Sequence, residues 1–177
     1  MSLTTIKSTL GFLGGWLRGR LGINRSNATL EGITNYYMVD GLFPTSGQPD
    51  ENELDKICQS GYSCVINLAP NSMLENSVID EASILESNNV EYIHLPVNFQ
   101  RPSEKKFDAF VEAVQKRSGE KVWVHCAANM RVSAFTYRYR VQVLGENSDT
   151  ARQDLNQLWE PFGVWKTFIE KANQIPE

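Results

Sequence analysis

Short runs of apolar, β-branched residues mark the strands of this chain. Residues 121–125 (KVWVH), 63–68 (SCVINL) and 92–97 (YIHLPV) have this composition, and residues 35–40 (NYYMVD) form a further candidate. Strands that are apolar on both faces are typical of the buried interior of a parallel sheet. The run at 121–125 has this pattern, so we predict a sheet of about four or five strands with 121–125 in its middle.

Apolar residues spaced three and four apart predict helices between and after these strands. The predicted helices cover residues 50–60, 78–87, 103–117, 133–145, 148–158 and a last segment that opens at Pro161. Asp50 and Glu53 form a capping box at the start of the first of these helices, and Ser148 or Asp149 would cap the fifth helix. Residues 41–49, rich in Gly and Pro, predict a loop. The alternation of strands and helices predicts a three-layer α/β sandwich with a central, mostly parallel sheet.

The amino-terminal segment, residues 1–27, is the most unusual part of the chain. Its large apolar residues recur at helical spacing: Leu3, Ile6, Leu10, Leu13, Leu17 and Leu21. Glycines weaken such a helix, and Lys7 and two arginines make it basic within an acidic chain. One interpretation is an amphipathic helix that binds a membrane surface or a partner. The other, which we favour, is a flexible, partly helical leader packed on the core. We therefore divide the chain into an extension at 1–30 and a domain at 31–177.

Composition limits the class of protein. With 177 residues, 41% of them hydrophobic, the chain can build one globular domain of ordinary size. Its net charge of −4 argues against nucleic acid as the main partner, because such partners usually require a basic surface. Three cysteines without framework spacing predict free thiols and a cytoplasmic location. The sequence contains no metal-ligand cluster and no apolar run long enough to cross a membrane, and it does not indicate an oligomeric state.

The candidate chemistry lies where the strand at 121–125 ends. Cys126 follows this strand directly, and a short loop separates it from the helix expected to start at Ser133. Loop N–H groups and the positive end of a helix dipole form an anion site, and the same field favours a thiolate at Cys126. Arg131 carries a planar guanidinium that can hold two oxygens of a phosphoryl or sulfuryl group. These residues predict a nucleophilic cysteine beside an anion-binding loop.

The stretch HCAANMRVS, from His125 on, resembles the HC…R signature of cysteine-dependent, dual-specificity-type protein phosphatases. Four residues separate Cys126 from Arg131, whereas the usual signature has five. An ungapped alignment therefore places Val132 at the position of the arginine and Asn129 at that of a glycine. A loop of four residues is similar to that of the phosphatase-like domain of beta-lactamase-hydrolase-like proteins, and also to that of rhodanese sulfurtransferases.

Two further stretches support the resemblance to the phosphatase-like group. SGQP at residues 46–49 and VINL at residues 65–68 resemble segments of that group upstream of its HC loop. The resemblance covers roughly residues 36–145. It implies the cysteine-phosphatase fold and hydrolysis of phosphomonoesters, on phosphotyrosine or phosphoserine in proteins or on small molecules. It implies no metal and no organic cofactor.

The resemblance also implies roles for single residues. Cys126 would attack phosphorus, Arg131 would hold the phosphoryl oxygens, and Ser133 would donate a hydrogen bond to the cysteine sulfur. His125 would orient the loop. The rest of the phosphate-binding loop would be Ala127, Ala128, Asn129, Met130 and Val132. Dual-specificity phosphatases often carry an aspartate as general acid after the preceding strand, and the matching residue here is Asn98, which cannot donate a proton as an acid.

Residues that follow Asn98 do not identify a general acid, and the sequence allows functions other than a phosphatase. Glu104 and Asp108 follow Asn98, but we interpret both as helix-start residues, with Ser103 as the cap. His94, within a predicted strand, is interpreted as structural. Two other functions remain alternatives to the phosphatase. A sulfurtransferase would carry persulfide sulfur on the loop cysteine, which the short loop favours. A phosphate-binding module without catalysis would fit the departures at the arginine and acid positions.

Overall fold

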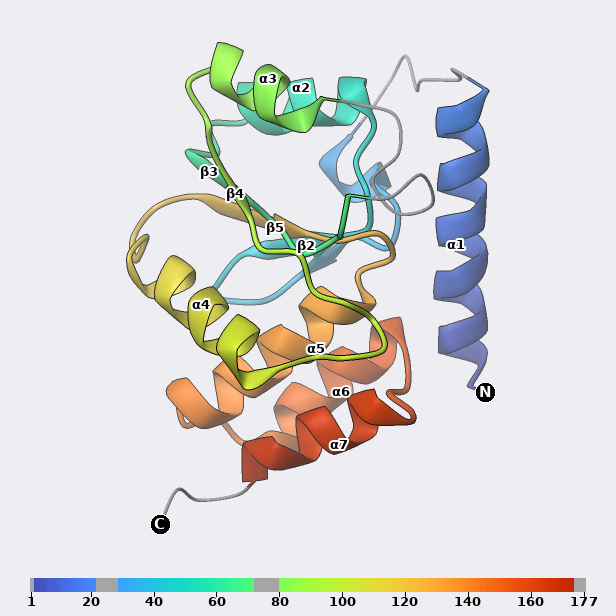
Figure 1. Ribbon diagram of the computed structural model, residues 1–177, viewed down its shortest axis with the longest axis vertical. Coiled ribbons are helices and arrows are strands. Elements are labelled where there is room, and N and C mark those ends of the chain that lie inside the picture. The colour runs from blue at the N-terminus through green and yellow to red at the C-terminus, as the bar shows by residue number, and fades with distance from the viewer. Residues whose placement is uncertain (1, 22–28, 72–79, 174–177) are drawn as a thin grey trace.

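Five strands form a central sheet in the order β1-β2-β5-β3-β4 in the computed structural model, which describes residues 2–21, 29–71 and 80–173 (Figure 1). The strands are β1 (Tyr37–Met38), β2 (Pro44–Ser46), β3 (Cys64–Asn67), β4 (Glu91–His94) and β5 (Val122–His125). Neighbours run parallel, except that β1 is antiparallel to β2. β5 occupies the middle of the sheet and is buried along its whole length, which confirms the prediction made from its apolar faces.

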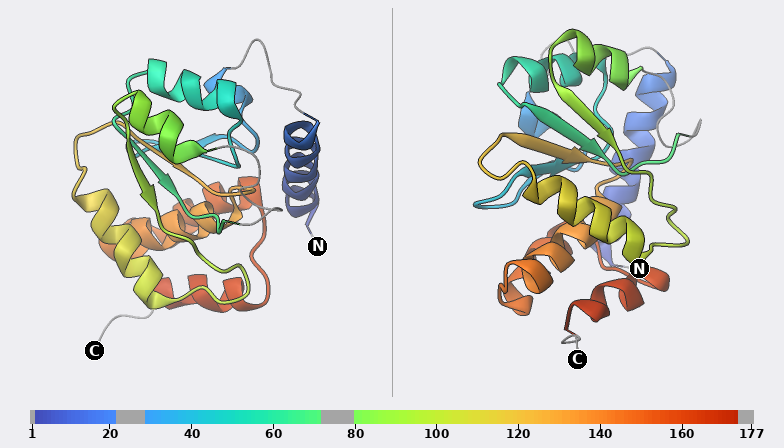
Figure 2. Two further views of the ribbon diagram at one scale, coloured as in Figure 1. Left: turned by 45° about the horizontal axis from the view of Figure 1, so that its top comes forward. Right: turned by 60° about the vertical axis from the view of Figure 1, so that its left-hand side comes forward.

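Helices cover both faces of the sheet and complete the three layers expected from the sequence (Figures 1 and 2). One face carries α2 (Glu51–Gln59) and α3 (Glu81–Ser87). The other carries α4 (Glu104–Gln115), α5 (Met130–Arg138), α6 (Ser148–Leu158) and α7 (Val164–Glu170). A π-helical turn at Tyr139–Val143 extends α5, and short 3₁₀ turns lie at Leu30–Gly32 and Lys171–Asn173. The predicted fold class is confirmed.

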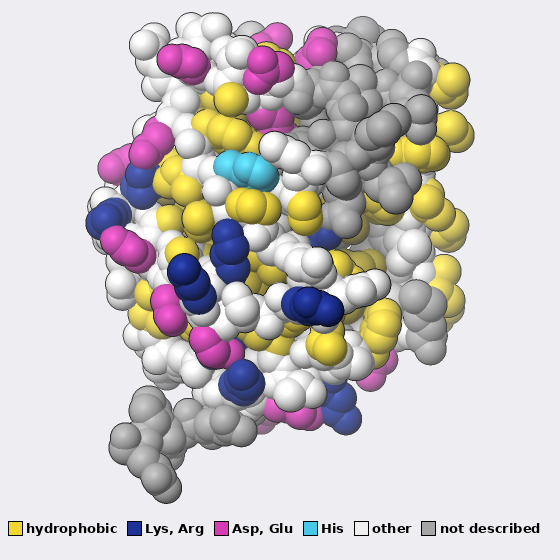
Figure 3. All heavy atoms as spheres, in the orientation of Figure 1, with side chains coloured by type: hydrophobic (Ala, Val, Ile, Leu, Met, Phe, Trp, Pro, Cys, Tyr) yellow, Lys and Arg dark blue, Asp and Glu magenta, His cyan; other side chains and the backbone are white. Residues whose placement is uncertain are grey.

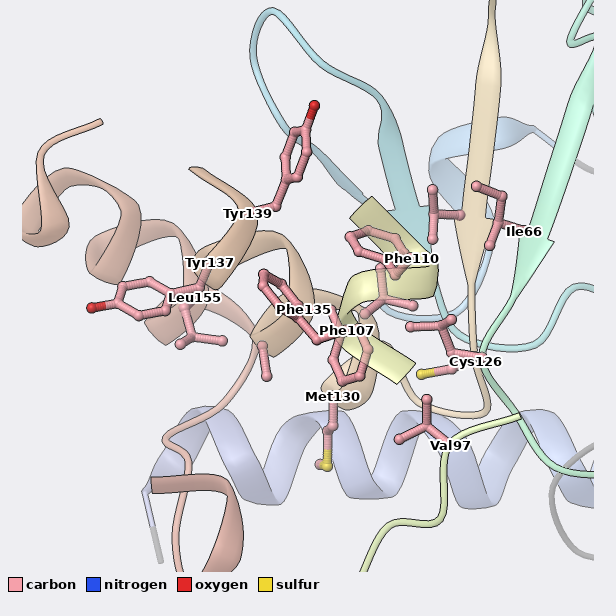
Figure 4. Packing of buried hydrophobic residues seen from close by; sticks show 14 of the residues in the cluster. Ile66, Val97, Phe107, Phe110, Cys126, Met130, Phe135, Tyr137, Tyr139 and Leu155 are labelled. Carbon is pink, nitrogen blue, oxygen red and sulfur yellow. The ribbon is translucent and has the colours of Figure 1, made fainter. Parts of the chain in front are cut away.

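α5 runs through the larger helical layer, and every one of its residues is buried. Aromatic rings pack around Phe135 on this helix, with the ring centroids of Phe110 and Phe168 at 5.7 and 5.0 Å from its own. Figure 4 shows Cys126 and Val97 at one end of this apolar cluster, where β5 passes into the loop before α5. Close packing on both sides of that loop leaves its ends little freedom to move.

α1 (Leu3–Arg20) lies outside the sandwich, beside α6 (Figure 2). Its inward face carries hydroxyl groups: Ser8 Oγ donates to the carbonyl of Leu158, and Thr5 Oγ1 accepts from Glu160 N at 3.0 Å. α1 is packed on the sandwich, as we favoured for this segment, but it is helical from Leu3 to Arg20 and its leucine row faces away from the core. Among the described residues, no helix is both long enough and apolar enough to cross a membrane.

Two segments depart from the predicted strands. The region expected to be a loop at 41–49 contains β2, whose Thr45 pairs in parallel register with β5. Pro44 takes the first position of this strand, where a missing N–H is tolerated. β4 ends at His94 instead of residue 97, although Leu95 N and Val97 N still donate to Asn67 O and Leu68 O at 2.9 and 3.0 Å.

α5 begins earlier in the sequence than predicted, and α7 begins later. α5 begins at Met130 instead of Ser133, because Asn129 has a left-handed backbone (φ 62°) that turns the chain directly into the helix. α7 begins at Val164 instead of Pro161, since Gly163 just before it has φ 55° and cannot be part of the helix.

The cap of α6 and the start of α3 also differ from the prediction. Asn147 caps α6 in place of Ser148 or Asp149, and its Oδ1 accepts from the backbone N–H groups of residues 149 and 150 at 2.9 and 3.1 Å. Asn is as good a helix cap as Ser or Asp, so its position one residue earlier decides the start. Of the helix predicted at 78–87, the structure describes Glu81–Ser87, and Val78 and Ile79 lie outside the described residues.

Candidate active site

The loop that joins β5 to α5 begins at Cys126 and is largely buried. Asn129, the last residue before the helix, is left-handed, a conformation that asparagine tolerates better than most residues. Its Nδ2 donates to Asn35 O at 2.8 Å and to Thr45 Oγ1 at 2.9 Å. The turn is therefore held from outside the loop, and it places Arg131 in the first turn of α5.

The SGQP segment supports the first half of this loop. Cys126 N donates to Ser46 O at 3.2 Å, and Gln48 N donates to Ala127 O at 3.1 Å. Gly47 lies between these two contacts and forms a bridge to the loop. The segment noticed in the sequence as a motif is thus a backbone strap that runs along the cysteine loop.

Polar side chains from the strands and the loops that follow them surround the buried carboxylate of Glu81. It lies at the first position of α3 and accepts hydrogen bonds from Gln48 Nε2, from Asn67 Nδ2 at 2.8 Å and from Tyr92 OH at 2.8 Å. His125 Nε2 lies 3.6 Å from Glu81 Oε1. Asn67 and His125 are register partners in β3 and β5, so the parallel sheet itself brings these side chains together.

The pKa of Glu81 is set by opposing effects. Burial raises it, but the proximity of His125, followed by hydrogen bonds from Gln48 and Tyr92, lowers the pKa from 4.5 to about 2. Glu81 is therefore a buried carboxylate across the ordinary pH range. Its Oε1 lies beside the imidazole of His125, the residue that directly precedes Cys126.

Glu81 was not among the site residues predicted from the sequence. An acidic residue at the start of a helix is ordinarily explained by the helix dipole, and nothing else distinguished this one. A signal was present in its partners, because Gln48, Asn67 and His125 each lie at or just past the end of a strand. Polar side chains at the carboxyl ends of neighbouring parallel strands meet at one edge of the sheet, where open α/β folds bind ligands.

Arg131 is held against an aromatic ring. Its buried guanidinium covers Phe99, with Cζ 5.5 Å from the ring centroid. Phe99 packs in turn against Trp159 and Trp165, with centroids 6.0 and 5.3 Å away, and its carbonyl accepts from Trp165 Nε1 at 2.7 Å. The loop after β4 is thereby pinned against α7. This cation–π contact restricts the orientation of the guanidinium.

Comparison with known families agrees with this geometry. Residues 30–164 match the family model described as "DSP-PTPase phosphatase fused to NAD+ Kinase". The chain belongs to this phosphatase family. The match confirms the assignment to the cysteine-phosphatase-like superfamily that the HC…R resemblance suggested.

Solved structures share the fold of this phosphatase family member. A DUF442 protein from Shewanella putrefaciens CN-32, assigned as a phosphatase, is 28% identical at a TM-score of 0.69, over 81% of this chain and 93% of that protein. P. aeruginosa TpbA is 16% identical at a TM-score of 0.65, over 83% and 89%. The core catalytic domain of the PP-IP phosphatase SIW14 from S. cerevisiae is 13% identical at 0.66, over 78% and 85%. No curated protein matches the chain.

The general acid of a phosphatase is expected in the loop after β4, where this chain carries Asn98. The side chain of Asn98 is exposed, and its Oδ1 accepts from Gln100 N at 2.8 Å. The amide therefore closes a local turn of its own loop. Its neighbour Phe99, not Asn98, makes the contact with Arg131.

Glu104 has a structural role in this phosphatase. It accepts hydrogen bonds from Arg138 at 3.1 and 2.8 Å and from Lys171 at 3.0 Å, and the hydrogen bonds from Arg138 are the main cause of its lowered pKa.

Ser103 is the N-cap residue of α4, as predicted, but its side chain makes no capping hydrogen bond. His94 is structural, as expected, since its Nε2 lies 2.7 Å from Ala69 O.

Ser133 and Val132 lie in the first turn and a half of α5. Ser133 Oγ donates to Met130 O at 3.1 Å and accepts from Trp159 Nε1 at 3.1 Å, so it joins the start of α5 to the end of α6. The hydrogen bond from Ser133 to the Cys126 sulfur remains a prediction. Val132 is wholly buried in the apolar core.

Gly47→Ala is expected to lower both the free energy of unfolding and turnover. A Cβ at this position would lie 2.9 Å from Ala127 O and 3.0 Å from Thr34 O, both backbone atoms, so the cysteine loop would have to shift. Overpacking of this kind typically costs about 1–3 kcal/mol. Urea unfolding and steady-state phosphatase kinetics measure the two effects.

Gly119→Ala is the matched control for this substitution. Gly119 has φ 87°, so alanine is strained there too, but nothing lies near its Cβ position. The control should lose stability and keep kcat/KM. Equal kcat/KM values for the two variants would show that Gly47 does not position the loop.

Proposed function

We propose that this chain is a cysteine-dependent phosphatase that hydrolyses phosphomonoesters with Cys126 as the nucleophile. The observation that carries the proposal is the position of Cys126 at the start of a buried loop, with Arg131 in the first turn of the helix that follows. Backbone N–H groups at a helix start together with a guanidinium suit a phosphoryl group. Membership in a phosphatase family supports the same reaction.

The proposed reaction has two displacements at phosphorus. In the first, the Cys126 thiolate attacks, an S–P bond forms, and the P–O bond breaks with its electron pair left on the departing oxygen. In the second, water attacks phosphorus, the S–P bond breaks, and thiolate and inorganic phosphate are released. Loop N–H groups and Arg131 stabilise the charge that develops on the equatorial oxygens.

Three further residues are assigned supporting roles. His125, held by Glu81, orients the backbone that enters the loop. Ser133 would donate to the sulfur as it leaves phosphorus. The strap at residues 46–49 keeps Cys126 N and Ala127 O in place.

Arg131→Lys is expected to lower kcat/KM for p-nitrophenyl phosphate by about 10²-fold. Lysine keeps the charge but loses the planar fork that holds two oxygens, and it cannot stack on Phe99 in the same way. Arg152→Lys, on α6, is the control and should keep its activity. If Arg131→Lys turns over substrate at the unmodified rate, the loop relies on backbone donors alone.

Asn98 predicts a preference among leaving groups. Without a general acid at this position, aryl phosphates should be hydrolysed faster than alkyl phosphates, because a phenolate leaves without protonation more readily than an alkoxide. General acid catalysis is worth about 10²–10⁴-fold. Asn98→Asp should therefore raise turnover of an alkyl phosphate more than that of p-nitrophenyl phosphate. Similar rates for the two substrates in the unmodified protein would argue that another group supplies the proton.

A parallel assay tests the proposed function. The unmodified protein is given p-nitrophenyl phosphate in one reaction and thiosulfate with cyanide in the other. Phosphate release without thiocyanate supports the phosphatase. Thiocyanate formation would instead support a sulfurtransferase, which the four-residue spacing of Cys126 and Arg131 favours. Phosphate binding without either product would support a binding module. Phosphotyrosine and phosphoserine peptides and small phosphate esters then define the substrate class.

A further inference from the structure

α1 presents a continuous apolar stripe to solvent. Figure 3 shows hydrophobic side chains along the edge of the molecule that α1 occupies. The stripe consists of Leu3 (86% exposed), Ile6 (42%), Leu10 (62%), Leu13 (48%), Leu17 (53%) and Leu21 (62%). Thr5 and Ser8, buried on the opposite face, bind the sandwich. Scattered exposed leucines need no explanation, but a row of six along one helix usually marks a binding surface.

The charge of this segment differs from that of the rest of the chain. Lys7, Arg18, Arg20 and Arg25 are the four basic residues among the first 30, and all 21 Asp and Glu residues lie beyond position 30. The segment that carries the stripe therefore has a charge of +4 in a chain whose net charge is −4. An apolar row on a helix that carries basic and no acidic residues is typical of helices that lie in the interface of an anionic lipid bilayer.

We propose that α1 docks this protein on an anionic membrane surface through its leucine stripe. A second copy of the chain is a poorer occupant for two reasons. Pairing two α1 helices would bring basic residues together without acidic partners, whereas coiled coils usually pair opposite charges beside the apolar seam. The spacing also extends over little more than two heptads, short of the three or four that a stable coiled coil needs.

The contacts between α1 and the rest of the protein connect this helix to the cysteine loop. Asn35 Nδ2 donates to Ser8 O in α1 at 2.9 Å and to Ala128 O in the loop at 3.0 Å. Gly11 allows this close approach, since a Cβ there would lie 2.8 Å from Asn35 Oδ1. A lipid-bound α1 would therefore hold the Cys126 loop at a fixed distance from the bilayer.

Vesicle flotation of the full chain tests the proposal. The protein is mixed with vesicles of phosphatidylcholine alone or of phosphatidylcholine with phosphatidylglycerol, at low and high ionic strength. Binding is expected with the anionic vesicles, and it should weaken as salt screens the charges. The triple variant Leu10→Ser, Leu13→Ser, Leu17→Ser should bind about tenfold or more weakly, since it removes three apolar side chains from the lipid. Lys7→Glu should also weaken binding.

Controls separate membrane binding from a change in fold. Leu144→Ser replaces a leucine of similar exposure (43%) away from α1, and it should bind vesicles like the unmodified protein. The triple variant should keep its thermal midpoint and its p-nitrophenyl phosphate turnover, because its three side chains face solvent. Three results would overturn the proposal: equal binding to neutral and anionic vesicles, binding unchanged in the triple variant, or a dimer in light scattering that the triple variant loses while vesicle binding is absent.

Discussion

Cys126→Ser is expected to lower kcat for p-nitrophenyl phosphate by on the order of 10⁴-fold or more. A thiolate attacks phosphorus without help, whereas a serine hydroxyl is a weak nucleophile until a base removes its proton. The substitution changes one atom at a buried position, so the loop, Arg131 and the strap should keep their geometry. The variant should therefore still bind phosphate, which isothermal titration measures independently of turnover.

The other two cysteines supply the control for this prediction. Burial raises the pKa of Cys64 to about 12 and also raises that of Cys58, so both remain thiols at neutral pH. Cys58→Ser should keep full activity. Iodoacetamide should inactivate the unmodified protein through Cys126, as peptide mass mapping would show, and phosphate should protect it. Inactivation that follows labelling of Cys58 or Cys64 would contradict the assigned nucleophile.

Part of this site could be predicted because its determinants are local in sequence. An apolar strand at 121–125 can only be satisfied inside a sheet, and the cysteine that follows it must then lie at the carboxyl edge. Asn129 stands where the family that the loop resembles usually has glycine, and its φ of 62° is a left-handed conformation that glycine and asparagine tolerate. The strand, the turn and the position of Arg131 therefore follow from neighbouring residues.

The rest of the site depends on pairings that span long distances in sequence. β2 has three residues, one of them proline, so it has no periodic pattern and exists because β1 and β5 pair with its two edges. The spacing of the leucines in α1 predicted a helix but not which face packs. The face that packs is the one that carries Ser8 and Thr5, because their hydroxyl groups form hydrogen bonds with backbone groups at the end of α6. Glu81 could be identified only once its partners had been assembled by the sheet.

Glu81→Gln is expected to lower the free energy of unfolding at neutral pH by about 3 kcal/mol. The amide is nearly isosteric with the carboxylate, but its NH₂ group would face donors on Gln48, Asn67 or Tyr92 and would leave one of them unsatisfied. It also removes the negative charge beside His125. Urea unfolding measures the loss. Glu86→Gln, at an exposed position of the same helix, is the control and should change stability by less than about 0.5 kcal/mol.

The same variant makes a pH-dependent prediction with a definite sign. The pKa of Glu81 is about 2 in the folded protein and 4.5 as the reference for the unfolded chain, so its contribution to stability is present above pH 4.5. It is lost as the pH falls from 4.5 toward 2, because the unfolded chain takes up the proton first. The difference in unfolding free energy between the unmodified protein and Glu81→Gln should therefore be largest at neutral pH and shrink below pH 4.5. A difference that stays constant down to pH 3 would show that Glu81 stabilises the fold by its shape and hydrogen bonds, and that its charge contributes nothing.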